Sequence, residues 1–238
     1  MIDTILFDLD GTLAPFIQDE FVKKYFYIYS EIVAKLGYSR EGFIKAMWTG
    51  VDAMLKNDGS SLNMERFWDG FASVLGEDAR KLKATANDFY KNEFNLVKSV
   101  VKPHAPRRHL IDSLKQKGFT LILATNPIFP PSAVASRLSW CGLSPDDFSY
   151  ITTYDNSTFC KPNPGYYEEI LKKCGKTVEN CLMVGNNPDD DMAAAKLGFE
   201  VFLITDTIEN PNDSDCSAYP NGSYADLEKY LLSLASPQ

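Results

Sequence analysis

The chain has 238 residues, of which 45% are hydrophobic and 24% charged, and its net charge is −8. This length is enough to bury a sizeable core in one large domain or two modest ones. Because basic residues do not cluster, we expect no nucleic-acid partner. No apolar run reaches the roughly 18 residues that span a bilayer, so we expect no membrane partner.

The cysteines and the N-terminus bear on where the protein works. The five cysteines are an odd number without CxxC spacing, which predicts free thiols rather than disulfides or a zinc site. The first residues lack the charged and then apolar pattern of a signal peptide. We therefore expect a cytoplasmic protein.

The first predicted element is a strand over residues 4–7, and it ends in DLDGT at 8–12. Asp8 and Asp10 are two positions apart, so on an extended chain they point the same way. Carboxylates beside a buried strand need a compensating charge. A cation between the two aspartates would supply it.

Residues 16–97 have the periodicity of helices and are rich in aromatic side chains. Phe21, Tyr25 and Tyr29 recur at helical spacing, as do Phe67 and Phe71, which is typical of core positions. Breaks near residues 37–39, 57–61 and 76–77 predict about four helices. We expect a helical domain over 16–97, inserted between residues 1–15 and 98–238 of an α/β domain.

The remaining chain alternates between apolar runs and helical stretches. Continuous apolar runs suit strands buried on both faces, and their alternation with helices indicates βαβ units. The prediction is a doubly wound, five-stranded parallel sheet, with residues 209–223 as a polar surface loop. The strands are expected at 4–7, 120–124, 150–152, 181–184 and 201–205, and the helices at 107–117, 132–141, 164–174, 190–197 and 224–234.

Polar residues follow four of the predicted strands. They include Thr125 and Asn126 after the second strand, Lys161 after the third and GNNPDDD at 185–191 after the fourth. Taken singly, such residues are typical of turns, helix caps or surface charges. Because ligands bind at the carboxyl ends of parallel strands, their order favours one site for a phosphate beside a metal ion.

These segments resemble the four motifs of the haloacid dehalogenase-like hydrolase superfamily. The matching stretches are DLDGT at 8–12, Thr125-Asn126, Lys161-Pro162 and VGNNPDDD at 184–191. The helical insert resembles the C1-type cap of the same superfamily. The resemblance implies a Rossmann-like core and a Mg²⁺-dependent phosphatase that acts on a small phosphorylated metabolite through an aspartyl-phosphate.

The resemblance also assigns roles to residues. Asp8 would attack phosphorus, which splits the hydrolysis into two steps, and Asp10 would act as general acid and base. Thr125, Asn126 and Lys161 would bind the phosphoryl group and offset its charge.

The expected metal site departs from the family pattern at one position. The metal ligands implied by the resemblance are Asp8, Asp10, Asn186 and either Asp190 or Asp191. The family usually has an acidic residue where this chain has Asn186, and an amide oxygen brings no charge to the metal. We therefore expect a weaker metal site.

Two alternatives to a phosphatase stay open, and a third is disfavoured. A phosphosugar mutase would use the same intermediate, and Asn186 favours a non-enzymatic protein that binds phosphorylated metabolites. Dehalogenases of the superfamily lack the second aspartate, so Asp10 argues against that activity.

Other residues carry less specific expectations. His104 and His109 are expected to be surface or capping residues, which disfavours triad chemistry. Within 16–97, Lys45, Trp48 and Trp68 would either reach the site or belong to the helical bundle.

Overall fold

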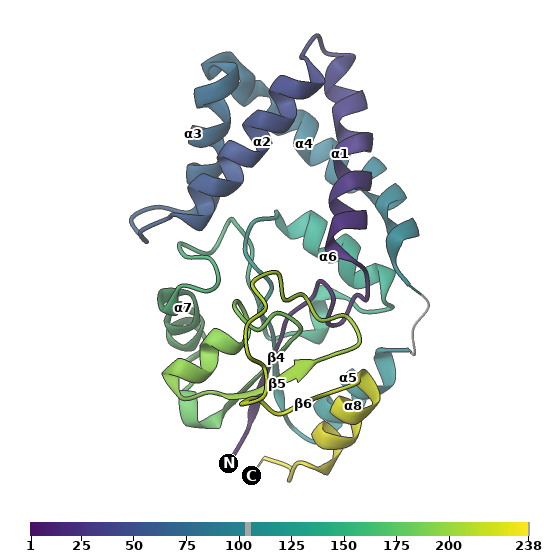
Figure 1. Ribbon diagram of the computed structural model, residues 1–238, viewed down its shortest axis with the longest axis vertical. Helices are drawn as coiled ribbons and strands as arrows, with labels where there is room; N and C mark the ends of the chain where they lie inside the picture. The colour runs from purple at the N-terminus through teal and green to yellow at the C-terminus, as the bar shows by residue number, and fades with distance from the viewer. Residues whose placement is uncertain (103–105, 238) are drawn as a thin grey trace.

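The computed structural model describes residues 1–102 and 106–237, and its centre is a parallel β-sheet (Figure 1). The strand order is β3-β2-β1-β4-β5-β6, with every neighbouring pair parallel. This confirms the predicted α/β class. The strands are β1 (Thr4–Phe7), β2 (Thr120–Leu123), β3 (Tyr150–Ile151), β4 (Cys181–Gly185), β5 (Glu200–Ile204) and β6 (Asn221–Gly222).

The sheet has six strands rather than the five expected. The sixth, β6, lies in the segment predicted to be a loop, and Asn221 and Gly222 pair with Leu203 and Ile204 of β5. A two-residue Asn-Gly strand has no apolar pattern, so hydrophobic periodicity could not reveal it.

Helices cover both faces of the sheet. Ile5 and Phe7 of β1 belong to the cluster that includes α5 (Arg108–Gln116), α6 (Pro131–Trp140) and α8 (Tyr224–Ser233). Leu6, which points to the other face, packs with α7 (Pro164–Cys174). Burial on both faces explains why the strands are continuously apolar.

Not every expected helix forms. The helix predicted over 190–197 is a 3₁₀ helix, η5 (Met192–Leu197), and it packs on the same face as α7. The preceding residues form a turn instead, in which the Asn187 side chain accepts hydrogen bonds from the backbone N–H groups of Asp189 and Asp190. Asparagine favours such local side-chain bonds over a helix. Two further 3₁₀ helices, η3 (Pro145–Asp147) and η4 (Val178–Asn180), precede β3 and β4.

Residues 16–97 form helices that stack at one end of the molecule, opposite the two termini (Figure 1). Helices α2 and α3 pack so closely that a Cβ on Gly70 would lie 2.8 Å from the Thr49 carbonyl oxygen. The elements are α1 (Gln18–Ala34), α2 (Arg40–Leu55), α3 (Asn63–Leu75), η1 (Glu77–Lys81), α4 (Leu82–Lys91) and η2 (Glu93–Val100).

The helical part is fastened to the sheet part by polar and aromatic contacts. Asn63, which is fully buried at the start of α3, donates through Nδ2 to the carbonyl oxygens of Pro127 and Phe159, at 3.2 and 3.3 Å. Phe94 of η2 lies 5.1 Å from Trp140 of α6, measured between ring centroids. The expected boundary at 97–98 falls inside η2, and the division into two domains stays a prediction.

Several smaller expectations can be checked directly. Within residues 1–102 and 106–237, no helix combines the length and apolar content needed to cross a membrane. All five cysteines are free. The His109 side chain is 75% exposed, and His104 lies outside the described residues.

Candidate active site

The register of the central strands brings the expected site residues together. Phe7 of β1 pairs with Leu123 on one side and Val184 on the other. The residues that follow these positions therefore meet at one edge of the sheet. Asp8 continues the pairing through its N–H, which donates to the Val184 carbonyl oxygen at 2.8 Å.

Lys161 joins two of the aspartates. Its Nζ donates to Asp8 Oδ1 at 2.8 Å and to Asp191 Oδ1 at 2.6 Å, and its side chain is 1% exposed. Burial alone would lower the pKa of Lys161, but Asp191 and Asp8 raise it well above its usual range. Lys161 is thus a fixed positive charge beside Asp8.

Asp191 shapes the loop after β4. Its Oδ2 accepts hydrogen bonds from the N–H groups of Asn186 and Asn187, both at 3.0 Å. Burial raises the pKa of Asp191, and the charge of Lys161 opposes this shift. Both carboxylate oxygens of Asp191 are thus engaged in hydrogen bonds within the chain.

Asp10 has a partner that the sequence did not suggest. It forms an ion pair with Arg137 of α6, which is fully buried and stacks over the Phe129 ring at 4.3 Å. Burial raises the pKa of Asp10 to about 6, with Arg137 opposing and Asp8 reinforcing the shift. Among the described residues, Asp10 Oδ1 is buried without a hydrogen-bond partner.

Thr125 and Asn126 follow β2, as expected. The Thr125 carbonyl oxygen accepts hydrogen bonds from the hydroxyls of Thr152 and Tyr166, at 2.6 and 2.9 Å. These bonds fix the backbone that carries the Thr125 side chain. Within the described part of the chain, Asn126 Oδ1 is buried and unpartnered.

Asn186 lies between the loop that carries Thr12 and the loop that carries Thr207, and it is hydrogen-bonded to both. The Thr12 hydroxyl donates to its Oδ1 at 3.2 Å, and its Nδ2 donates to the Thr207 carbonyl oxygen at 2.7 Å. Gly11, at φ +82°, passes so close that a Cβ there would lie 2.2 Å from Asn186 Nδ2. Only glycine combines this backbone angle with this approach.

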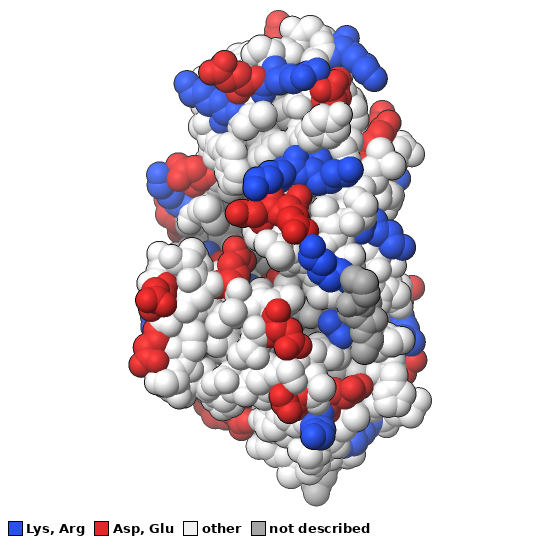
Figure 2. Space-filling view, turned by 45° about the vertical axis from the view of Figure 1, so that its right-hand side comes forward, with Lys and Arg blue, Asp and Glu red and all other residues white. Residues whose placement is uncertain are grey.

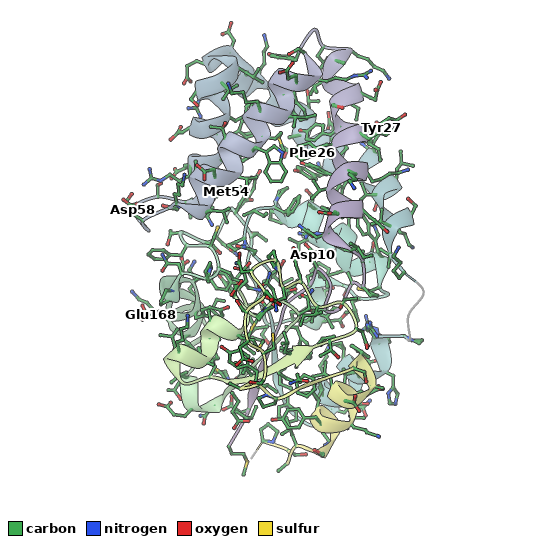
Figure 3. The ribbon with its side chains drawn as sticks, in the orientation of Figure 1. Asp10, Phe26, Tyr27, Met54, Asp58 and Glu168 are labelled. Carbon is green, nitrogen blue, oxygen red and sulfur yellow. The ribbon has the colours of Figure 1, made fainter. Side chains whose placement is uncertain are left out.

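These residues line a cavity of about 140 Å³ at the junction of the helical and sheet parts. Figure 3 places Asp10 at this junction, and Figure 2 shows acidic side chains in the recess between the two parts. The cavity thus gathers all the predicted site residues. Its walls include Asp8, Asp10, Thr125, Asn126, Lys161, Asn186, Asn187, Asp190, Asp191 and Glu209.

Glu209 is a member of this site that the sequence analysis missed. It lies in the loop after β5, where its N–H donates to the Asn186 carbonyl oxygen at 2.9 Å. Burial raises the pKa of Glu209, and so do the charges of Asp8, Asp190 and Asp10. The available signal was its position after the fifth strand, since that loop opens at the same edge of the sheet.

Arg137 was missed for a different reason. In the sequence it is one residue of the helix predicted over 132–141. Val134, Trp140 and Cys141 lie three before, three after and four after it, so Arg137 falls on the apolar face. An arginine on such a face is buried only with a partner, which is the signal that was available.

The donor set around the cavity fits a divalent cation. Carboxylate and carbonyl oxygens are the ligands that Mg²⁺ and similar hard ions prefer, and Mg²⁺ usually takes only one or two protein carboxylates. Among the described residues, no three His, Cys, Asp or Glu side chains are already grouped so as to hold a metal ion. Negative charge exceeds positive charge at the site, with Asp8, Asp10, Asp190, Asp191 and Glu209 against Lys161 and Arg137.

Comparisons with known proteins agree with this architecture. The chain is 28% identical over 208 residues to a phosphoglycolate phosphatase of Vibrio parahaemolyticus, covering 86% of this chain and 84% of the relative. It is 25% identical to the pyrophosphatase PpaX of Halalkalibacterium halodurans, covering 85% and 83%. A solved 2-haloacid dehalogenase from Pseudomonas syringae shares the fold, with a TM-score of 0.62, 19% identity and coverage of 97% and 98%.

A family model completes the comparison. The model described as haloacid dehalogenase-like hydrolase matches residues 2–198, which span β1, the helical insert and the strands up to β4. The four motif segments all lie within this match. The chain therefore belongs to the haloacid dehalogenase-like hydrolases.

Proposed function

We propose that this hydrolase is a Mg²⁺-dependent phosphatase that cleaves a small phosphorylated metabolite through an aspartyl-phosphate on Asp8. One observation carries the proposal. Asp8 is hydrogen-bonded to the buried cation Lys161, and Asp10 lines the same cavity while paired with Arg137. The curated phosphatase relatives support the same reaction class.

In the first step, the Asp8 carboxylate would attack phosphorus while the bond from phosphorus to the leaving oxygen breaks. Asp10 would donate its proton to that oxygen. Burial is the largest cause that raises the pKa of Asp10 to about 6. This value suits the role, because a general acid works best when its pKa lies near the ambient pH.

In the second step, Asp10 would take a proton from water, and the water oxygen would attack phosphorus. The bond between phosphorus and Asp8 then breaks, which releases inorganic phosphate and restores both carboxyl groups. Thr125 and Asn126 would hold the phosphoryl oxygens, and Lys161 would offset the charge of the transition state.

A bound Mg²⁺ would neutralise the repulsion between the phosphate and the carboxylates and orient the phosphoryl group. We assign its protein ligands to Asp8, the Asp10 backbone carbonyl and Asp190. Asp190 is preferred to Asp191, because both oxygens of Asp191 already accept hydrogen bonds. The Asn186 oxygen, at 3.2 Å from the Thr12 hydroxyl, stays a predicted ligand.

The test compares the wild-type protein with Asp8→Asn, using release of inorganic phosphate from a panel of phosphate monoesters with and without Mg²⁺. We expect turnover that requires Mg²⁺ and is abolished in the variant, which should still fold and melt cooperatively. Transfer to a sugar hydroxyl without phosphate release would indicate a mutase instead. Binding without turnover would indicate the non-enzymatic alternative. A cytoplasmic location stays a prediction.

A further inference from the structure

A second cavity, of about 90 Å³, lies among the helices of the insert. Its walls come from α1 to α4, with Ile128, Phe129 and Tyr154 from the sheet part. Protein interiors contain few voids larger than a water molecule. This cavity is therefore larger than the packing defects usual in a helical core.

The lining of this cavity is aromatic and uncharged. Among its described wall residues there is no Lys, Arg, His, Asp or Glu. Two of the hydroxyls that could hold water, those of Tyr25 and Tyr90, are bonded to each other at 2.7 Å. The other polar wall groups, the Gln18 amide, Trp68 Nε1 and the Tyr29 and Tyr154 hydroxyls, are few beside the apolar side chains and rings. A mostly apolar cavity holds water poorly and accepts apolar groups.

The aromatic cavity adjoins the phosphate site. Gln18, Ile128 and Phe129 form part of the wall of both. Phe129 also lies beneath Arg137, which holds Asp10. The organic part of the substrate is bonded to the leaving oxygen, which Asp10 protonates. It would thus extend past Phe129 toward the aromatic residues of this cavity.

Two half-buried rings mark the solvent side of the cavity. Phe26 of α1 points between the helices, whereas its neighbour Tyr27 points outward (Figure 3). The Phe26 ring lies 5.4 Å from that of Trp48 on α2, and Trp48 is 48% exposed. Of the three residues left open by the sequence, Trp48 and Trp68 line this cavity and Lys45 is exposed.

We propose that the substrate carries an apolar organic group, which binds in this aromatic cavity while its phosphate lies beside Asp8. The inference rests on the proposed phosphatase activity and names the class of its substrate. A carboxylate or second phosphate in the cavity would lose its hydration without meeting a cation, which is costly. Small anionic substrates, such as the one named for the phosphoglycolate phosphatase relative, fit this chain poorly.

Two esters of matched size test the proposal. Isobutyl phosphate and phosphoglycolate have the same number of non-hydrogen atoms beyond the ester oxygen, and both release a primary alcohol. We expect kcat/KM to be at least about tenfold higher for isobutyl phosphate, as for other differences of a few apolar groups in a pocket. Equal values, or a preference for phosphoglycolate, would overturn the proposal.

A pair of variants on one helix locates the effect. Trp48→Ala removes a wall of the cavity, whereas Leu55→Ala truncates a residue of α2 that is 47% exposed and outside the cavity wall. We expect Trp48→Ala to raise KM for isobutyl phosphate about fivefold or more and to leave that for phosphoglycolate unchanged. An equal effect on both esters, or the same effect from Leu55→Ala, would contradict the assignment.

Calorimetry separates this inference from the proposed function. The Asp8→Asn protein, loaded with Mg²⁺, is titrated with each ester at several temperatures. Burial of the isobutyl group predicts a more negative heat-capacity change than phosphoglycolate gives. If the wild-type protein hydrolyses no ester of the monoester panel, the proposed function fails, while this measurement still decides the binding preference. Absence of a preference overturns the inference.

Discussion

Arg137 and Asp10 form an ion pair in which the guanidinium is fully buried and packed over the Phe129 ring. The pair links α6 to the loop after β1, far apart in the sequence. It holds Asp10 Oδ2 and leaves Oδ1 without a partner among the described residues. In the proposed reaction, Oδ1 is the atom that faces the leaving oxygen.

Replacing Arg137 by Met therefore tests a positioning role. The change leaves Asp10 without its partner, and breaking a buried pair in this way costs about 3 kcal/mol of unfolding free energy. We expect kcat to fall about tenfold or more, since proton transfer typically contributes 10²–10⁴-fold. Both quantities can be measured, by urea unfolding and by phosphate release.

Two further variants show whether the effect of Arg137→Met comes from the loss of its positive charge beside Asp10. Arg137→Lys keeps the charge and should recover part of the activity. The double variant Arg137→Met/Asp10→Asn should be more stable than Arg137→Met alone, because the unpaired carboxylate is gone. A kcat within about twofold of wild type in Arg137→Met would show that Asp10 needs no such positioning.

Glu209 is expected to strengthen metal binding. Its carboxylate adds negative charge beside Asp8 and Asp190, at a site where the family acid is replaced by Asn186. Groups around a metal that are not direct ligands shift its affinity about 10–100-fold, so we expect Glu209→Gln to weaken Mg²⁺ binding about tenfold. The measurement is the rise in melting temperature with Mg²⁺ concentration.

The matched control is Asp215→Asn, which removes the same charge from an exposed position in the same loop. It should leave the Mg²⁺ dependence unchanged. Equal shifts in the two variants would mean that Glu209 acts only through the net charge of the protein.

The parts of the structure that the sequence predicted are those with local signals. Asp8 and Asp10 follow a strand whose apolar run is continuous, and Thr125 and Lys161 follow strands of the same kind. Parallel pairing then requires these strand ends to meet, which the register of Phe7 with Leu123 and Val184 confirms.

The parts that were missed depend on tertiary contacts. β6 is held by the pairing of Asn221 and Gly222 with β5, not by any apolar pattern of its own. Arg137 becomes part of the site only because α6 packs beside the loop that carries Asp10. The hydrogen bonds of Asn186 to Thr12 and Thr207 likewise join segments that are distant in the sequence.

The contacts of Asn186 change what is expected of an acid at this position. In Asn186→Asp, a carboxylate oxygen would face the Thr207 carbonyl oxygen in place of the donor Nδ2. Loss of a buried hydrogen bond with an unsatisfied partner costs about 1–3 kcal/mol, so the metal-free variant should be less stable by that amount. Urea unfolding in EDTA measures this difference.

Asn187→Asp is the matched comparison. Asn187 accepts through Oδ1 from the N–H groups of Asp189 and Asp190 at 2.9 Å, which a carboxylate can also do, and its side chain hydrogen-bonds to Glu209 as well. Without metal, Asn187→Asp should lose stability too, because its carboxylate would face that of Glu209, so the comparison uses the increment in stability that Mg²⁺ adds to each variant. If added Mg²⁺ stabilises Asn186→Asp more than Asn187→Asp, position 186 contacts the metal. The reverse order would assign that contact to position 187.

Asp147 should make stability depend on pH at a place remote from the active site. Burial alone would raise its pKa, but hydrogen bonds from Arg108, the Ser144 N–H and Lys115 lower the pKa to about 2. Arg108 donates to both carboxylate oxygens, at 2.6 and 2.7 Å. Asp147 is 6% exposed, whereas the Arg108 side chain is 40% exposed, so solvent screens the pair in part.

The direction of this pKa shift determines how the stability of the folded protein changes with pH. A carboxyl group whose pKa is about 3.8 in the unfolded chain and about 2 in the folded one stabilises the protein above pH 4, and this contribution disappears as the pH falls through 2. Its size at pH 7 is about 2 kcal/mol, and about half of it remains at pH 3. Asp147→Asn should therefore be less stable than wild type by about 2 kcal/mol at pH 7, with a smaller difference at pH 3.

Asp112→Asn is the control, because Asp112 also contacts Arg108, at 3.2 Å, but is 45% exposed. An exposed pair contributes about 0–1 kcal/mol, so this variant should stay close to wild type at both pH values. Urea unfolding of the three proteins at pH 7 and pH 3 decides the matter. A difference for Asp147→Asn that does not shrink at pH 3 would show that the residue stabilises the fold through its shape and hydrogen bonds, not through its charge.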